Sequence, residues 1–324
     1  MRCRPLVVLS VGWFVMQAIP VGAQTMNFTP VGSIAGPADL VKVSGRYAYV
    51  SAGKTLTIVD VTDPAAPKRA GAYTFPELIW GLTVVGSTAY VAADTYGLGI
   101  LDVSNAAAPV LRGALKTPGQ AKNVALFGTR ALLADHVSGI DVVDISTPAK
   151  PVLVGSFFVD GFAKDVVTTG TLAFALDQPA GLYVFDLAKL ESFEPAATMT
   201  LASPIPLRAQ LTVGQMPSTD GQRLAVVVGG GPIQIYDVSN RQAMVHAASY
   251  RTPGVAQRVS LMGTRAYVAD GPAGLQVVDL SAPSKPSIVG SYKTAAPARD
   301  VAVDGSLVFV IVGNEQVLIL RQGQ

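Results

Sequence analysis

Residues 258–298, RVSLMGTRAYVADGPAGLQVVDLSAPSKPSIVGSYKTAAPA, decide the fold because they form one copy of a unit that recurs along the chain. The unit contains four short runs rich in Val, Ile, Tyr and Ala, separated by turns that contain Gly, Pro or Ser. Such runs predict β-strands. The runs are almost continuously apolar, which is typical of strands that are covered on both faces.

The unit recurs at a nearly constant spacing. A turn glycine follows the first run at Gly45, Gly86, Gly128, Gly170, Gly221, Gly263 and Gly305. An aspartate ends the third run at Asp60, Asp102, Asp144, Asp186, Asp237 and Asp279, and Arg321 takes the seventh place. The interval between Gly170 and Gly221 is longer than the others, which predicts an insertion there. The chain therefore consists of seven units of about 42 residues.

The two ends of the repeat array complement each other. The last unit stops after its third run at residues 317–320, whereas residues 30–34 (PVGSI) match the fourth run of other units, such as residues 289–292 (VGSY). A closed ring uses such a split, because the N-terminal strand completes the last unit; a linear solenoid would need capping units instead. We therefore predict an all-β fold, a seven-bladed β-propeller of four-stranded blades closed by an N-terminal outer strand.

The third runs and the turns after them resemble those of the LVIVD-repeat family of exported bacterial and archaeal propeller proteins. The residues that carry the resemblance are TIVD at 57–60, DVVD at 141–144 and QVVD at 276–279. The resemblance covers residues 29–321. It implies a propeller in the periplasm or at the cell surface, and it implies no particular reaction.

Residues 1–23 have the features of a secretory signal peptide. Arg2 and Arg4 precede a short apolar run, and Val21-Gly22-Ala23 supplies small residues for cleavage. We expect residues 24–324 to form a single propeller domain with no membrane span, located in the periplasm, at the cell surface or outside the cell. This part lacks cysteine and carries 22 basic and 22 acidic side chains, since Cys3 and the two arginines lie in the leader. The balance argues against nucleic acid as a partner.

The repeated Val-Val-Asp aspartates invite a metal or catalytic interpretation. Each precedes a turn, however, and repetition in nearly every unit favours a structural role because Asp accepts hydrogen bonds from nearby backbone N–H groups. The sequence also lacks zinc-ligand spacing, a P-loop and a Gly-x-Ser-x-Gly nucleophile elbow. We therefore predict no metal, no cofactor and no catalytic residues.

Two kinds of position are predicted to surround the mouth of the central channel. They are the beginnings of the innermost strands and the loops between second and third strands, where propellers often bind ligands. The candidate residues for a ligand or partner are Trp80, Lys122, Asp135, His136, Lys164, Asp165, Arg258, Arg299 and Asp300. The alternatives are mutually satisfied charges around a wet channel, a turn role for Asp135, a plain loop role for His136 and a packing role for Trp80.

The sequence favours an exported binding or interaction scaffold whose partner is a protein, a peptide or a carbohydrate of the cell envelope. The alternative is a propeller enzyme, a hydrolase or lyase with a polar site at the channel mouth, in which His136 would act as a base. A surface-layer component is a third possibility.

Overall fold

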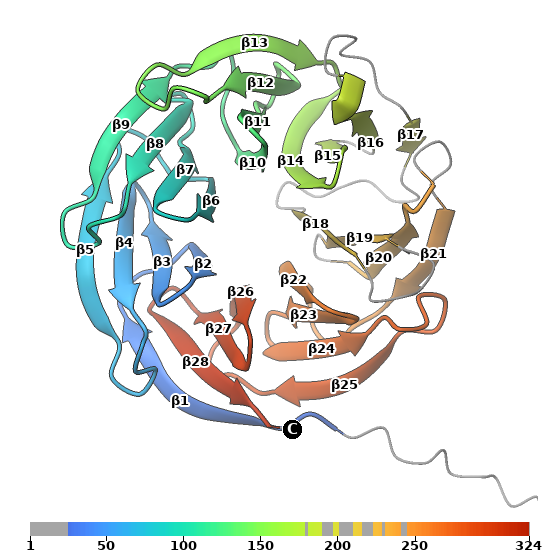
Figure 1. The fold of residues 1–324 in the computed structure, drawn as a ribbon. Coiled ribbons are helices and arrows are strands. Elements are labelled where there is room, and N and C mark those ends of the chain that lie inside the picture. Colours follow the sequence, from blue (N-terminus) through green and yellow to red (C-terminus); the bar gives the residue numbers. More distant parts are fainter. Residues whose placement is uncertain are drawn as a thin grey trace, which may run out of the picture.

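The computed structural model describes residues 25–178, 181–189, 197–200, 210–215, 223–228, 231–240 and 245–323. Within them, 28 strands form seven four-stranded antiparallel sheets that stand around a central axis like the blades of a propeller (Figure 1). The all-β propeller of four-stranded blades is thus confirmed. The predicted signal peptide, residues 1–23, lies outside the described residues.

Six sheets are each built from four strands that are consecutive in the sequence, ordered from the axis outward. The first three are β2 (Leu40–Ser44), β3 (Tyr47–Ala52), β4 (Thr55–Asp60) and β5 (Lys68–Thr74); β6 (Gly81–Val85), β7 (Thr88–Ala92), β8 (Leu98–Asp102) and β9 (Val110–Leu115); and β10 (Asn123–Phe127), β11 (Arg130–Ala134), β12 (Ile140–Asp144) and β13 (Val152–Phe157). The next three are β14 (Phe162–Thr169), β15 (Leu172–Gln178), β16 (Gly181–Asp186) and β17 (Ala197–Thr200); β18 (Gln210–Gln215), β19 (Arg223–Val228), β20 (Ile233–Asp237) and β21 (Val245–Tyr250); and β22 (Arg258–Met262), β23 (Arg265–Ala269), β24 (Leu275–Asp279) and β25 (Ser287–Tyr292).

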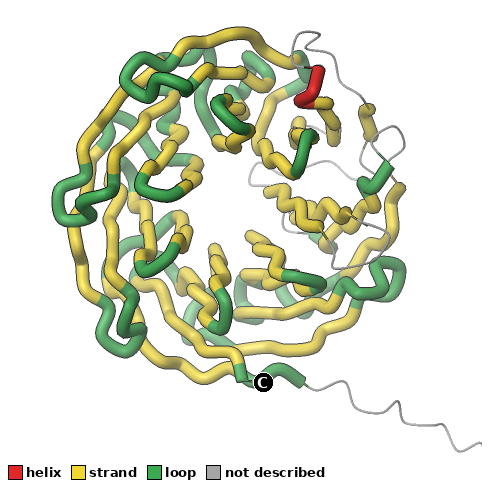
Figure 2. The backbone as a smooth tube through the Cα atoms, in the orientation of Figure 1, coloured by secondary structure: helices red, strands yellow, loops and turns green. Residues whose placement is uncertain are grey.

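The remaining sheet joins the two ends of the chain. It combines β26 (Ala298–Asp304), β27 (Leu307–Val312) and β28 (Gln316–Gln322) with β1 (Phe28–Ala35), which pairs antiparallel with β28 from Phe28 opposite Gln322 to Ala35 opposite Gln316. Figure 2 shows β1 running along the outer edge beside the C-terminus. The backbone N–H of Met26 also donates to the carbonyl of Val289 in the neighbouring sheet at 2.6 Å. The predicted closure by an N-terminal outer strand is confirmed.

The hydrophobic core lies between adjacent blades. One cluster joins Leu56, Ile58 and Phe75 of the first unit to Leu82 and Val91 of the next, and similar clusters fill other interfaces between described blades. A sheet that lies between two such clusters is covered on both faces, which explains why its strands are almost continuously apolar instead of alternating.

The Val-Val-Asp aspartates form the turns that follow the third strands. Asp60, Asp102, Asp144, Asp186, Asp237 and Asp279 each accept a hydrogen bond from the backbone N–H two residues later, at 2.8–3.1 Å. The predicted turn role is confirmed for all six. A single 3₁₀ turn, η1 (Leu187–Lys189), follows Asp186, and most of the predicted insertion after it lies outside the described residues.

Candidate functional site

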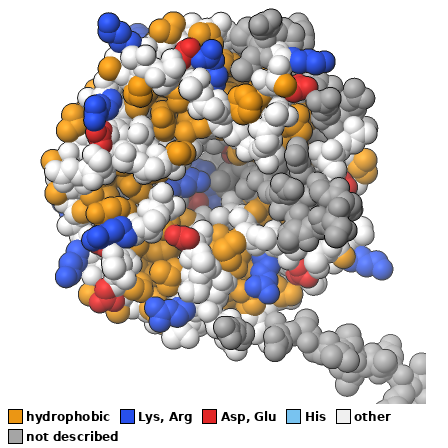
Figure 3. All heavy atoms as spheres, viewed as in Figure 1, with side chains coloured by type: hydrophobic (Ala, Val, Ile, Leu, Met, Phe, Trp, Pro, Cys, Tyr) orange, Lys and Arg blue, Asp and Glu red, His pale blue; other side chains and the backbone are white. Residues whose placement is uncertain are grey.

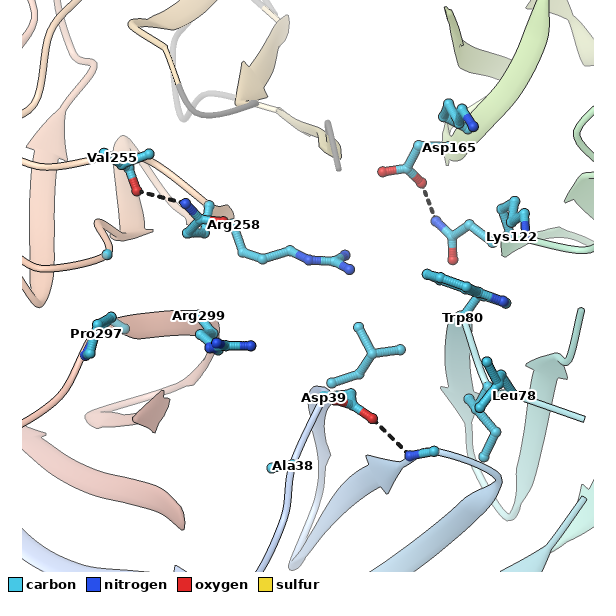
Figure 4. A pocket seen from close by; sticks show the side chains of 18 of the residues that line it. Ala38, Asp39, Leu78, Trp80, Lys122, Asp165, Val255, Arg258, Pro297 and Arg299 are labelled. Carbon is cyan, nitrogen blue, oxygen red and sulfur yellow. Dashed lines mark hydrogen bonds between the residues drawn. The ribbon is translucent and has the colours of Figure 1, made fainter. Parts of the chain in front are cut away.

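A cavity of about 820 Å³ lies on the axis of the ring (Figure 4). Its walls come from the beginnings of the innermost strands, for example at Trp80, Lys122 and Arg299, and from the loops between second and third strands at Gly53, His136 and Gly271. The two kinds of position that the sequence selected therefore meet around one space. Figure 3 shows the ring hollowed at its centre, with Lys or Arg side chains visible inside.

Seven of the nine predicted residues line this cavity. They are Trp80, Lys122, His136, Lys164, Asp165, Arg258 and Arg299. Asp135 and Asp300 do not line it, because they are buried behind its wall.

Trp80, Lys122 and Asp94 form a connected group on one wall. The Trp80 indole Nε1 donates to Asp94 Oδ2 at 2.7 Å, and Lys122 Nζ lies 3.5 Å from the same oxygen. The ammonium also sits 4.5 Å from the centroid of the indole ring, within cation–π range. These contacts hold the Trp80 ring in place. Trp80 is nevertheless 43% exposed, so its ring remains available for contact with a partner.

His136 occupies a backbone position that glycine takes in other units. Its φ is +54°, and the equivalent loop positions Gly53 and Gly271 have φ of +57° and +53°. In each of these three loops the residue's carbonyl accepts a hydrogen bond from a backbone N–H at the beginning of the next blade. A histidine is uncommon at positive φ, and such outliers cluster at functional sites.

The imidazole of His136 stacks on Phe162, with 4.5 Å between ring centroids and 17° between ring planes. Burial lowers the pKa of His136, and the charges of Lys164 and Lys122 lower it further, against an opposing effect of Asp135 and Asp94. These effects favour the neutral form of the ring. Within the described residues, no group forms a hydrogen bond with the imidazole.

Lys164, Arg258 and Arg299 bring positive charge to the cavity and have no ion-pair partner in the part of the chain that the structure describes. Among the described residues, no carboxylate lies within 4.0 Å of their charged nitrogens. Burial lowers the pKa of Lys164, and the charge of Lys122 adds to this effect. Lys122 is paired with Asp94. It is the one of the four cavity cations whose charge is offset by a neighbouring acid among the described residues.

The buried aspartates serve the scaffold. Asp165 Oδ1 accepts hydrogen bonds from the Asn123 side-chain amide and, at 2.9 Å, from its neighbour's backbone N–H at Val166. Asp300 Oδ2 accepts from the backbone N–H of Val41 in the adjacent blade at 2.9 Å. Both residues follow a β-bulge in the first strand of their blade. They tie neighbouring blades together at the channel.

Asp135 ties down the loop that connects β9 of the preceding blade to β10 of its own blade. Its two carboxylate oxygens accept from the Thr117 hydroxyl at 2.7 Å and the Gly119 backbone N–H at 2.6 Å. Asp270 makes the same pair of contacts with Thr252 and Gly254. The carboxylate therefore anchors a neighbouring loop, a structural role that differs from the turn role predicted for Asp135.

Sequence reasoning missed several residues that shape the site. They are Asp94, which contacts Trp80 and Lys122, and the apolar residues Phe162, Leu78 and Val255. Phe162 begins the innermost strand β14 and is 44% exposed, and Leu78 and Val255 line the cavity. The available signal was an apolar residue between the outer strand of one blade and the innermost strand of the next.

The described residues contain no group of three or more His, Cys, Asp or Glu side chains arranged to hold a metal ion. His246, the other histidine of the described chain, lies in β21 and its Nε2 is 2.9 Å from Gln234 Oε1. The site offers cations, an aromatic surface and an imidazole.

The LVIVD repeat model matches residues 35–74, 79–117, 118–159 and 253–294. The chain belongs to the LVIVD repeat family. The resemblance inferred from the third strands and their turns is thereby confirmed. None of the curated protein sequences matches the chain.

Solved structures share the fold. The β-propeller domain of Myceliophteria thermophila Cps50 (Swd1) superposes with a TM-score of 0.73 at 13% identity over 91% of this chain and 99% of that one. A chain of a mitotic checkpoint complex gives 0.72 at 12% identity over 98% and 99%. The computationally designed protein Ika8 gives 0.63 at 7% identity over 90% and 98%. These likenesses concern the propeller fold alone.

In the part of the chain that the structure describes, we find no helix with the length and apolar character needed to span a membrane.

Proposed function

We propose that this LVIVD repeat protein is an exported binding module that receives a partner at the mouth of its central channel. The observation that carries the proposal is the cavity of about 820 Å³, which several blades share and which combines unpaired cations with exposed aromatic surface. Ligand sites typically combine a concave apolar surface with a few placed polar groups. A propeller fold supports such a role in general.

The rim of the cavity supports the proposal. Half of the exposed large hydrophobic residues in the described part of the chain lie at this end of the blades, five in loops and Phe162 at the first position of β14. They are Leu78, Trp80, Val137, Phe158, Phe162 and Val255. Aromatic residues are enriched at protein interfaces because they bury a large area with few rotatable bonds. The rim therefore suits a partner that extends beyond the cavity itself.

The hydrolase or lyase alternative lacks a comparable observation. A catalytic histidine is ordinarily oriented by a hydrogen-bonded partner and lies within reach of a nucleophile. The His136 imidazole stacks on Phe162 and has no hydrogen-bonded orienting group in the described residues. Binding is the function that the geometry supports best.

A thermal-shift screen of the purified protein tests this proposal. The panel contains short peptides, oligosaccharides and organic acids, because a ligand that binds only the folded state raises the melting temperature. We expect a shift that is lost in the double variant Trp80→Ala, Phe162→Ala. The matched control is Val110→Ala, Val152→Ala, which removes exposed apolar side chains from outer strands. Equal shifts in both variants, or no shift with any member of the panel, would contradict the proposal.

Export belongs to the same proposal and has its own test. Residues 1–23 carry the leader features, so we expect the mature chain to begin at Gln24 in the periplasm, at the cell surface or outside the cell. Intact-mass spectrometry of protein recovered from the producing cells would show the loss of these residues. A mass that retains them in every fraction would contradict export by cleavage.

A further inference from the structure

The cavity carries more positive than negative charge that is free to act on a ligand. Four of its lining residues are cations, namely Lys122, Lys164, Arg258 and Arg299, and two are acids, Asp39 and Asp165. Asp165 is buried and its Oδ1 already accepts from Asn123 and Val166, while Asp39 Oδ2 accepts from the Gly53 backbone N–H at 2.7 Å. The acids are therefore engaged by the scaffold, whereas three of the cations have no carboxylate within ion-pair distance among the described residues.

The cations face one another across the cavity. In Figure 4, Arg258 and Arg299 lie on one side, and Trp80, Lys122 and Asp165 lie on the other. The Arg258 side chain extends from its strand into the open space. A negatively charged group between these walls would be approached by guanidinium groups from one side and ammonium groups from the other. Such charge-assisted hydrogen bonds are stronger than neutral ones.

The lowered pKa values of His136 and Lys164 agree with an excess of positive charge at the channel mouth. Burial is the larger cause of the lowered pKa of both His136 and Lys164, and the charge of Lys122 contributes to both. Mutual repulsion of this kind is relieved when an anion binds.

The apolar rim indicates how large the anionic partner is. Leu78, Trp80 and Val255 line the cavity with exposed fractions of 42%, 43% and 39%, and Phe162 stacks on His136, which also lines the cavity. A free inorganic or small organic anion would contact the cations and leave these side chains in water. A peptide places apolar side chains beside an acidic one, so it satisfies both surfaces.

We propose that the occupant of the channel mouth is an acidic peptide segment of a partner protein, with Asp or Glu side chains between Lys164, Arg258 and Arg299 and flanking apolar side chains on Trp80 and Phe162. This inference rests on the proposed function and adds the chemistry of the partner. Complementary charge selects the segment, and contact with the apolar rim adds area that is independent of charge.

Fluorescence anisotropy with two labelled peptide pools tests the proposal on the full chain. The first pool has the pattern aromatic, acidic, acidic, aliphatic, with small neutral residues on either side. The second pool replaces each Asp by Asn and each Glu by Gln. We expect the acidic pool to bind at least about tenfold more tightly at low ionic strength, and we expect added salt to reduce the difference.

Two charge-removing variants locate the contact. Lys164→Met, Arg258→Gln, Arg299→Gln removes the three unpaired cations, and we expect about a tenfold or greater loss of affinity for the acidic pool. Lys68→Met, Lys150→Met, Lys285→Met is the matched control, because it removes three exposed cations outside the cavity. We expect the control to bind within about twofold of the parent protein.

The outcomes separate this inference from the proposed function. Equal affinity for the two pools, or equal losses in the two charge variants, would overturn the acidic-peptide inference. If the amide pool also binds and the double variant Trp80→Ala, Phe162→Ala abolishes that binding, the proposed binding function is supported while the acidic-peptide inference is not. If glutarate or inorganic phosphate binds as tightly as the acidic pool and displaces it, the occupant is a small anion and the peptide inference is overturned. If neither pool nor these anions bind, both proposals fail.

Discussion

A methyl group at Gly113 would collide with the backbone of the next blade. Gly113 lies in the outer strand β9, and a Cβ placed on it would be 2.2 Å from the carbonyl oxygen of Pro148 and 3.1 Å from backbone carbons of Ala149. The equivalent Gly71 and Gly32 face carbonyl oxygens of Ala106 and Pro64 at 2.2 and 1.9 Å. Glycine in the fourth strand is thus required wherever the proline-containing turn of the neighbouring blade approaches.

The expected cost of Gly113→Ala follows from these distances. Close C···O contacts in proteins lie at about 3.3–3.6 Å, so the turn would have to move by roughly 1 Å. The turn resists this movement, because Ser146 N–H donates to Asp144 at 2.8 Å and Lys150 N–H donates to the Thr147 carbonyl at 2.8 Å. Overpacking of this kind costs about 1–3 kcal/mol and sometimes more, and we expect about 3 kcal/mol here because only backbone atoms are in the way.

Gly128→Ala is the matched control. Gly128 has φ of +55°, and a Cβ on it would meet nothing within 4 Å, so the substitution adds left-handed backbone strain of about 1 kcal/mol and no collision. For a domain of this size 1 kcal/mol shifts the melting temperature by about 2 °C. Thermal unfolding followed by circular dichroism should therefore show a fall of about 6 °C for Gly113→Ala and about 2 °C for Gly128→Ala. Equal falls would refute the argument that close approach between blades requires the outer-strand glycine.

Three further perturbations test the closure, a buried acid and the unusual histidine. Deletion of residues 24–38 removes β1 and exposes the edge of β28, so the melting temperature should fall and light scattering should reveal association; an unchanged melting curve would contradict closure by this strand. Burial is the main cause that raises the pKa of Asp141 to about 7; a hydrogen bond from Ser156 opposes the rise and the nearby charge of Asp135 adds to it. The folded state then holds a proton that the unfolded chain releases, so stability falls as pH rises from about 4 to about 7. Asp141→Asn should remove this pH dependence. Its free energy of unfolding should exceed that of the parent by about 1–2 kcal/mol at pH 8 and equal it at pH 3. If the urea-unfolding midpoints of the two proteins change in parallel across that pH range, the argument is wrong. His136→Gly relieves positive-φ strain but loses the stack on Phe162, so the melting temperature should change by no more than about 2 °C while binding of the acidic peptide pool weakens. A large loss of stability would show that His136 is chiefly structural.

The propeller was predictable because each repeat unit has the same pattern of strand and turn residues and therefore forms the same local structure. Turn glycines such as Gly45 and Gly128 adopt positive φ, and aspartates such as Asp60 and Asp144 bond to the backbone two residues later. These are local interactions, which residue types and spacing determine directly. The closure by β1 was also predictable, because a missing fourth strand at one end matched a surplus strand at the other.

The candidate site was predictable in position and less so in composition. The expected chain positions do surround one cavity, and seven of the nine candidate residues line it. Asp135 and Asp300 are instead buried, and they bond to the backbone of Gly119, 16 residues earlier, and of Val41 in the adjacent blade. Nothing in the neighbouring sequence distinguishes an acid that faces the channel from one that anchors a loop.

By itself the sequence determined the strands, the turns, the repeat and the way in which the ring closes, since each follows from short-range preferences and a regular period. Only the tertiary structure decided which charges remain without a partner. Whether Lys122 is neutralised and Lys164 is not depends on where Asp94 lies, and whether Trp80 is buried or exposed depends on how the blades meet. Lys122 and Asp94 are 28 positions apart and Trp80 and Asp94 are 14 apart, and they meet only once the strands between them have folded and adjacent blades have packed.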